Sequence, residues 1–351
     1  MEVAGKRLTV MGLGRHGGGV GAARWLAEHG ARVTITDRLP AEALGNSIVE
    51  LAGVPIERWR LGEHDERDFR ACDALVVNPA VRPDERWVQL AAASGATLTS
   101  EIELLLSVCP ALVVGVTGSV GKSSTASMLD QILQAAGRRS WLGGNIGGSL
   151  LGDAAQMCRD DVVVLELSSF QLYWLSAAAR MPQLALVTNC EPNHLDWHPT
   201  FDHYRQSKQR LLCGQQPGDR YILSAALADD PAWQRPWPGE RLAAGRLAAS
   251  ESLSADGSHQ RDNANLAAAA AIALGCERPA ISAGLAAFRG LPHRLQRIDL
   301  GGQRHVIDDS KATTPTATLA AIEAVAAKAW WLIGGANKGA DFAPLIERLA
   351  D

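Results

Sequence analysis

The sequence predicts an α/β protein with parallel sheets spread over two or three domains. Short apolar runs alternate with longer helical patterns, and this order is typical of βαβ units. At 351 residues the chain is longer than one ordinary domain and carries enough apolar material for more than one core. Two of the apolar runs lead into a glycine-rich turn and then a helix, which is an arrangement that presents backbone N–H groups to an anion.

The predicted elements fall into three groups along the chain, with boundaries expected near residues 107 and 297. The first group is strand 7–14, helix 22–30, and strands 31–37, 73–78 and 96–100. The second is strands 112–118, 162–167 and 184–189, a stretch at 216–258 that reads as loops with short elements, and helix 263–275. The third is strand 304–309, helix 315–327, strand 329–335 and a final helix at 341–351.

Composition excludes several classes of function. The chain is 47% hydrophobic and 21% charged, which is ordinary for a globular protein. A net charge of −4 does not favour a nucleic-acid partner, and no apolar run of about 18 residues predicts a membrane span. Six widely spaced cysteines without a C-x-x-C pair predict reduced thiols in the cytoplasm and no zinc site.

The first glycine turn matches a dinucleotide fingerprint. Gly12-Leu13-Gly14-Arg15-His16-Gly17 follows a strand and precedes a helix, and Asp37 ends the next strand. In such a unit the glycines admit a pyrophosphate to the helix N-terminus, and the acidic residue binds ribose hydroxyls. Because the motif is common, three readings stay open at this point: NAD binding, binding of another nucleotide-bearing ligand, and a structural turn.

The second glycine turn, GVTGSVGKSST at residues 115–125, is a phosphate-binding loop with altered spacing. The usual pattern needs a glycine five positions before Gly121, where this chain has Val116. Strand, loop and helix nevertheless follow in the order that a phosphate cradle requires. Lys122 is placed to pair with the outer phosphates, and Ser123 to bind magnesium.

Polar residues after the neighbouring strands are candidates for the same site. Glu166 ends the strand VVVLEL and is either a second magnesium ligand or a carboxylate facing solvent. His194 follows another strand end and is the better metal candidate among the nearby histidines, whereas His198 and His203 read as packed or solvated side chains. Lys208, on the helix that follows, reads by itself as a surface lysine.

Together these motifs resemble the Mur ligase family of ATP-dependent amide-forming enzymes. The string TGSVGKSS, the strand end ELSSFQL and the turn NHLD occur in family order. Further matches follow over essentially the whole chain: GGNIGGSL at 143–150, GSHQRDNANLAAA at 257–269, GLPHR at 290–294, DDSKAT at 308–313 and GGANKGADF at 334–342. ELSSFQL resembles most the members that add D-glutamate to UDP-N-acetylmuramoyl-L-alanine.

The resemblance implies three domains: a Rossmann-like UDP-binding domain at 1–107, a P-loop ATP-binding domain at 108–297, and an incomplete Rossmann-like amino-acid-binding domain at 298–351. It implies ATP and two magnesium ions as cofactors, with Lys208 carbamylated so that it becomes an oxygen ligand. The implied metal ligands are Ser123, Glu166, His194 and Lys208. The implied catalytic residues are Lys122, Glu166, His194 and Lys208. The implied ATP-binding residues are Gly118, Ser119, Gly121, Lys122, Ser123, Ser124, Asn263, Arg294 and Asp309.

The same resemblance assigns the first glycine turn to UDP, so NAD binding is no longer expected. The implied substrate-binding residues are Gly14, Arg15, His16, Asp37, Arg38, Asn145, Ser168, Gln171, Lys311, Thr313 and Lys338. Of these, the basic residues at 311 and 338 suit the carboxylates of D-glutamate.

The implied reaction is a step of peptidoglycan precursor synthesis in the cytoplasm, by a monomer. A substrate carboxylate attacks the γ-phosphate of ATP, and the amine then displaces phosphate from the acyl phosphate. Because the family's last domain extends past residue 351, the chain is expected to bind the UDP-linked substrate but to turn it over poorly. A sibling ligase for another amino acid and an inactive binding remnant are the alternatives.

Overall fold

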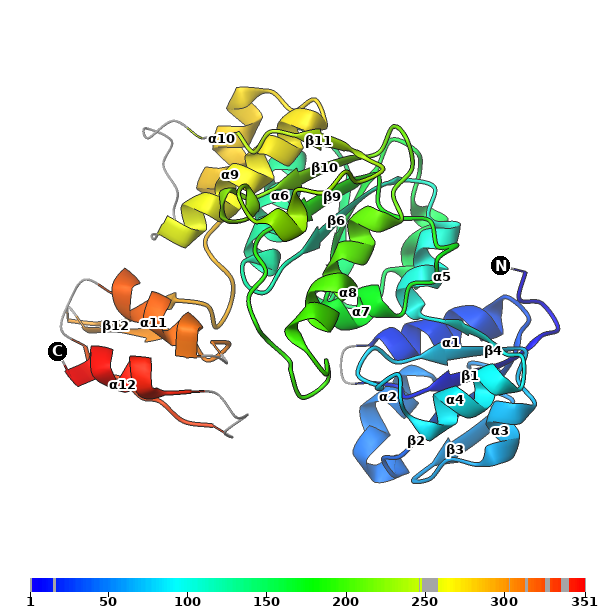
Figure 1. Cartoon of the computed structure of the whole chain (residues 1–351). Helices are drawn as coiled ribbons and strands as arrows, with labels where there is room; N and C mark the ends of the chain where they lie inside the picture. The colour runs from blue at the N-terminus through cyan, green and yellow to red at the C-terminus, as the bar shows by residue number, and fades with distance from the viewer. Residues whose placement is uncertain are drawn as a thin grey trace.

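Two parallel sheets form the body of the molecule (Figure 1). The computed structural model describes residues 2–14, 17–245, 247, 258–302, 304–312, 315–325, 329–335 and 341–350. Both sheets follow the predicted alternation of strand and helix. In each, the strand that feeds the glycine turn is an inner strand, whose neighbours on the two sides come from different parts of the chain.

The N-terminal sheet has the order β3-β2-β1-β4-β5 in the described part of the chain, and all its pairings are parallel. Its strands are β1 (Arg7–Met11), β2 (Arg32–Asp37), β3 (Arg58–Leu61), β4 (Ala74–Val77) and β5 (Thr97–Thr99). Its helices are α1 (Gly18–Glu28), η1 (Ala41–Leu44), α2 (Gly45–Glu50), α3 (Glu66–Arg70), α4 (Arg86–Ala93) and α5 (Glu101–Val108). The strand order reverses at β1, and ligands bind at such points in open α/β sheets.

The central sheet has the order β11-β10-β9-β6-β8-β7 among the described residues and is also parallel. Its strands are β6 (Leu112–Thr117), β7 (Ser140–Gly144), β8 (Val162–Glu166), β9 (Leu184–Val187), β10 (Arg220–Leu223) and β11 (Glu240–Leu242). Its helices are α6 (Lys122–Ala135), η2 (Leu151–Gln156), α7 (Ser169–Tyr173), α8 (Phe201–Cys213), η3 (Ala225–Leu227), η4 (Pro231–Trp233), α9 (Ser258–Ala273) and α10 (Arg278–Ala287). β8 and β9 are buried along their whole length because helices cover both faces, as in other parallel sheets.

The two sheets are joined by α1 and α5, which both contact η2 (Figure 1). Leu26 of α1, Leu105 of α5 and Leu151 of η2 belong to one buried cluster. The glycine turn of the first sheet therefore lies next to the central sheet. Within the described residues, every helix is too short or too polar to cross a lipid bilayer.

The C-terminal segment differs from its prediction. It contains an antiparallel pair, β12 (Gln296–Gly301) with β13 (Arg304–Asp308), and the helices α11 (Pro315–Ala324) and α12 (Ala343–Ala350). The predicted strand at 329–335 is wrong: these residues form no strand, and the side chains of Trp330 and Leu332 are fully exposed. An apolar run becomes a strand only beside a partner with free backbone groups, and no described strand lies against it.

The stretch at 216–258 contains short elements, as predicted, in its described part. Where described, it supplies β10 and β11, which extend the central sheet on the side of β9. β11 has only three residues, and two of them are exposed, so its hydrophobic pattern is too short to show in the sequence.

Candidate functional site

The turn between β1 and α1 is an anion cradle built from backbone. Gly12, Gly14 and Gly17 have φ angles of 85°, 70° and 78°, values that strain any other residue. Gly17 is the N-cap of α1 and provides no side-chain cap, so the first N–H groups of the helix have no intrahelical partner. A negatively charged group at this point is stabilised by those N–H groups and by the helix dipole.

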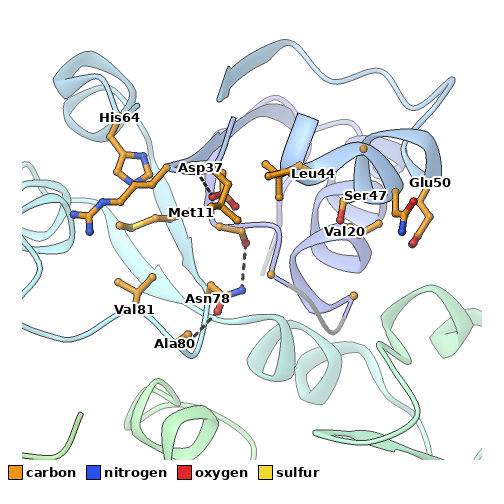
Figure 2. Close-up of a pocket in the computed structure, with 18 of the residues that line it drawn as sticks. Met11, Val20, Asp37, Leu44, Ser47, Glu50, His64, Asn78, Ala80 and Val81 are labelled. Atoms are coloured by element: carbon orange, nitrogen blue, oxygen red, sulfur yellow. Dashed lines mark hydrogen bonds between the residues drawn. The ribbon is translucent and has the colours of Figure 1, made fainter. Parts of the chain in front are cut away.

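Asn78, which directly follows β4, supports this turn through a side-chain hydrogen bond. Its Nδ2 donates to Gly12 O at 3.4 Å, and its Oδ1 accepts from Ala80 N at 3.0 Å (Figure 2). A Cβ on Gly14 would lie 2.5 Å from Asn78 Nδ2, so only glycine fits there. Sequence reasoning missed Asn78. The available signal was a polar residue directly after a buried strand.

A cavity of about 850 Å³ opens beside this turn (Figure 2). Gly14, Asp37 and Arg38 line it, as predicted for a nucleotide pocket. The Asp37 carboxylate accepts from Leu13 N at 3.0 Å and Leu39 N at 2.9 Å, which fixes its orientation while its remaining lone pairs stay available. Arg38 forms an ion pair with Glu85 on the opposite rim.

His64 also lines this cavity and was not predicted. Its Nδ1 lies 2.6 Å from Thr36 Oγ1, and its ring meets the edges of Phe69 and Trp87. Burial is the main cause that lowers the pKa of His64, with the Arg38 charge adding to it. The ring is therefore neutral at physiological pH and can serve as a hydrogen-bonding wall for an aromatic ligand. A lone histidine in a turn carries no signal of this in the sequence.

The second cradle lies between β6 and α6. Gly121 is the N-cap of α6 in the left-handed region, with φ 84°, and again gives no side-chain cap. Lys122 is the first residue of the helix, and its Nζ donates to the carbonyls of Gly118 and Ser119, both at 3.0 Å. Burial is the main cause that lowers the pKa of Lys122, and the charge of Glu166 acts in the opposite direction. Its ammonium is thus held at the mouth of the loop.

Asn189, which follows β9, fixes the shape of this loop. Its Oδ1 accepts from Ser119 N at 3.0 Å and from Val120 N at 2.9 Å. Ser119 is buried, and its Oγ lies 2.9 Å from the Tyr204 hydroxyl. The predicted phosphate residues Ser123 and Ser124 are buried in the first turn of α6. Asn189, like Asn78 and His64, is a site residue that sequence reasoning missed.

Lys208 is 1% exposed, so its reading as a surface lysine is wrong. Its Nζ donates to Gly118 O at 2.7 Å and lies 4.5 Å from the centre of the Tyr204 ring. Burial and then the charge of Lys122 hold the pKa of Lys208 well below its usual range. The residue occupies the face of α8 that lies against the phosphate loop, and the sequence pattern of this polar helix gave no indication of that.

Glu166, at the end of β8, carries a carboxylate suited to a cation. The residue is 2% exposed; its Oε1 accepts from Asn145 Nδ2 at 2.8 Å, and its Oε2 has no hydrogen-bond partner among the described residues. A buried carboxylate oxygen without a donor is costly unless a cation or water satisfies it. Glu166 Oε2 and Ser123 therefore fit one magnesium ion that takes its remaining ligands from phosphate oxygens and water.

The second predicted metal position fits less directly. Lys208 carries an amino group that donates hydrogen bonds, so it cannot bind a cation unless it is carbamylated. His194 is exposed, has φ 54°, and its ring meets the Phe170 ring at 4.8 Å. The described residues contain no group of three or more His, Cys, Asp or Glu side chains that could hold a metal without other ligands.

A second cavity, of about 400 Å³, lies between the first cradle and the ends of β7 and β8 in the central domain. It is lined by Gly14 from the first turn and by Asn145, Ser168 and Gln171 from the central sheet. Ser168 and Gln171 bond to each other as the capping box of α7, which fixes both side chains at the cavity wall. The predicted substrate residues of the two domains thus share one continuous space.

The remaining predicted residues lie around the phosphate loop or beyond it. Asn263 is buried against the loop: a Cβ on Gly121 would lie 2.3 Å from its Oδ1. Asp309 Oδ1 accepts from Leu295 N, and Arg294 is close enough to affect the pKa of Lys122. Lys311 is exposed on the C-terminal segment. The predicted residues that lie outside the described part of the chain are Arg15, His16, Thr313 and Lys338.

The fold is that of an α/β protein with two parallel sheets, each of which leads from an inner strand into a glycine turn at a helix N-terminus. The family model of the Mur ligase middle domain matches residues 116–243. The chain belongs to the Mur ligase family. It is 36% identical to the UDP-N-acetylmuramoylalanine--D-glutamate ligase of Roseiflexus sp., over 100% of this chain and 82% of the relative. It is 34% identical to the enzyme of that name from Geobacter metallireducens, over 98% and 80%.

Solved structures share the fold at lower identity. The UDP-N-acetylmuramate:L-alanyl-gamma-D-glutamyl-meso-diaminopimelate ligase of Neisseria superposes with a TM-score of 0.58 at 19% identity, covering 82% of this chain and 99% of its own. The UDP-N-acetylmuramate-alanine ligase of Thermotoga maritima gives 0.55 at 18% identity, covering 91% and 77%. MurF ligase of Thermotoga maritima, solved in complex with ADP, gives 0.54 at 17% identity, covering 92% and 72%. These likenesses support the architecture.

Proposed function

We propose that this chain joins D-glutamate to UDP-N-acetylmuramoylalanine with hydrolysis of ATP to ADP and phosphate. The observation that carries the proposal is the likeness, over nearly the whole chain, to relatives named for this reaction. The site supports it because the cavity beside the α1 cradle is also lined by Asn145, whose amide bonds to Glu166, and because, of the two cradles, only the one at α6 has a lysine at the first helical position. That asymmetry suits ATP at α6 and UDP at α1.

The chemistry follows from this arrangement. A carboxylate oxygen of the substrate, held near Asn145 and Ser168, attacks the γ-phosphorus of ATP, and ADP leaves. The D-glutamate nitrogen then attacks the acyl carbon, and phosphate leaves with the bonding electrons as the amine loses a proton. Lys122 neutralises charge that moves onto the phosphate oxygens, and catalysis consists mainly of positioning and electrostatics.

Magnesium supplies further charge neutralisation when bound at Glu166 Oε2 and Ser123. We further propose that Lys208 is carbamylated, together with a second ion near His194. A buried amine with a lowered pKa is present partly in its neutral form, which is the form that adds to carbon dioxide. Intact-mass measurement of the purified protein before and after mild acid tests this, since the carbamate is lost in acid.

We place the reaction in the cytosol, where ATP is available. The test is phosphate release by the purified chain with ATP, magnesium, UDP-N-acetylmuramoylalanine and a panel of amino acids. We expect release only with D-glutamate. Release with a different amino acid would identify a sibling ligase. If the chain binds the UDP-linked substrate but releases no phosphate with any amino acid, it is a binding remnant, and the proposal is overturned.

A further inference from the structure

Glu101 is a buried carboxyl group in the cavity between the first cradle and the central domain, and the proposed mechanism leaves it without a role. It is the first residue of α5 and follows β5, so it lies at the carboxyl edge of the N-terminal sheet. The residue is 9% exposed and lines the cavity of about 400 Å³. A carboxylate in such a place is costly unless it is paired or protonated.

The two oxygens of Glu101 face different partners. Oε1 accepts from the Ser149 hydroxyl. Oε2 lies 4.0 Å from the position that a Cβ on Gly18 would take, so it faces the first turn of α1, where the anion cradle opens. Any diphosphate seated in this cradle has Oε2 as a near neighbour.

Charged groups on the surrounding elements do not neutralise Glu101 from within this cavity. Of the described residues that line it, Glu101 alone has an ionisable side chain. On α5 itself, Glu103 Oε2 accepts from Ser176 N at 2.9 Å. Asp37, at the end of β2, lines the larger cavity and accepts hydrogen bonds from backbone N–H groups there. Asp153, on η2, does not line the cavity that contains Glu101. Arg15 and His16 of the turn lie outside the described residues and enter the test below.

We propose that protonated Glu101 donates a hydrogen bond from Oε2 to the diphosphate, or to the sugar next to it, of the bound UDP-linked substrate, so that binding takes up one proton from water. This inference rests on the proposed function. The ionised form repels the diphosphate, whereas the protonated form supplies a donor to an oxygen of the ligand. Burial raises the pKa of Glu101 to about 7 in the free protein, so the proton is available under physiological conditions.

The test is titration calorimetry with UDP-N-acetylmuramoylalanine, without ATP, from about pH 6 to about pH 8.5, in buffers of different ionisation enthalpy. We expect uptake approaching about one proton per ligand above pH 7, and an affinity that falls by up to about tenfold per pH unit. The diphosphate diester of the ligand does not titrate in this range. The variant E101Q should bind with an affinity independent of pH and without proton uptake.

Two further variants separate Glu101 from its surroundings. Ser149→Ala removes a hydrogen bond that lowers the pKa of Glu101, so the pH profile should move to higher pH while proton uptake persists. His16→Gln removes the histidine of the turn and should leave the dependence of ligand affinity on pH unchanged. The inference would be overturned if the affinity still fell with rising pH in E101Q, or if it no longer fell with rising pH in H16Q. Absence of binding at every pH would instead contradict the proposed function itself.

Discussion

The two cradles of this molecule have nearly the same backbone but different ionisable side chains around them. Each follows an inner parallel strand, and each ends in a left-handed glycine N-cap without a side-chain cap: Gly17 with φ 78° and Gly121 with φ 84°. Around Gly121 lie the amines of Lys122, which is half-buried, and of Lys208, which is buried. Around Gly17 the described ionisable groups that line the adjoining cavities include the carboxyls of Asp37 and Glu101.

This difference shows how the same backbone arrangement, a glycine turn at a helix N-terminus, can serve two different ligands. Helix N-termini supply a similar anion site in both places, so the backbone alone does not select the nucleotide. Selection comes from side chains. The amines beside Gly121 suit a triphosphate whose charge changes during reaction, whereas the mixed acidic and basic side chains that line the cavities beside Gly17 suit a ligand that is held but not cleaved. Three substitutions test this contrast.

The largest effect is expected for Lys122→Ala. Without the amine, charge on the transferred phosphate is not neutralised, and phosphate release should fall by about a thousandfold or more, as when one preorganised donor is lost elsewhere. Binding of the UDP-linked substrate in the other cradle should change little. Lys6→Ala is the matched control, because Lys6 is exposed near the start of β1. A residual rate near that of the wild type would contradict the assignment of this cradle to ATP.

The next effect compares the two glycine N-caps directly. Gly121→Ala places a Cβ 2.3 Å from Asn263 Oδ1, whereas Gly17→Ala meets no heavy atom within 4 Å. Both variants carry the left-handed penalty of about 1–2 kcal/mol, but only the first must also displace a buried side chain. Thermal unfolding and nucleotide binding should therefore show a clearly larger loss for Gly121→Ala. Equal losses of stability and of nucleotide binding in the two variants would mean that backbone strain alone accounts for the effect at both turns.

The third effect is confined to the pH dependence of stability and involves Glu101→Gln. The pKa of Glu101 is raised from 4.5 to about 7 by burial, so the folded state holds a proton that the unfolded state releases. Wild-type stability is therefore lost as pH rises from about 4.5 through about 7, and the glutamine variant escapes this loss. We expect E101Q to match the wild type near pH 4.5 and to exceed it in free energy of unfolding by about 3 kcal/mol above pH 7. Denaturant unfolding at several pH values measures this difference, and a constant difference would show that Glu101 does not titrate in this window.

Much of the fold was predictable because its signals are local. Buried parallel strands such as β8 (VVVLE) are continuous apolar runs, and both glycine turns follow directly from their glycine spacing. The predicted strand at 329–335 failed for the opposite reason. Its apolar run satisfies the local signal, but strand formation depends on a partner that no local pattern reveals.

The candidate site divides in the same way. Lys122 and Ser123 are set by their place in the loop motif, and Glu166 by its place at a strand end. Asn78 and Asn189 act through contacts with turns 66 and 70 residues away in the chain, so no spacing rule indicates them. His64 enters its cavity only because β2 and β3 pair.

The sequence by itself determined the class of fold, the two anion cradles and the family, because each is written in short stretches of adjacent residues. Only the tertiary structure decided the ionisation of the site. Lys208 looks like a surface residue on a polar helix and Glu101 like an ordinary helix N-terminal carboxylate, yet both are buried. Their pKa values depend on how much water the folded protein removes from around them, and that depends on elements brought together from distant parts of the chain.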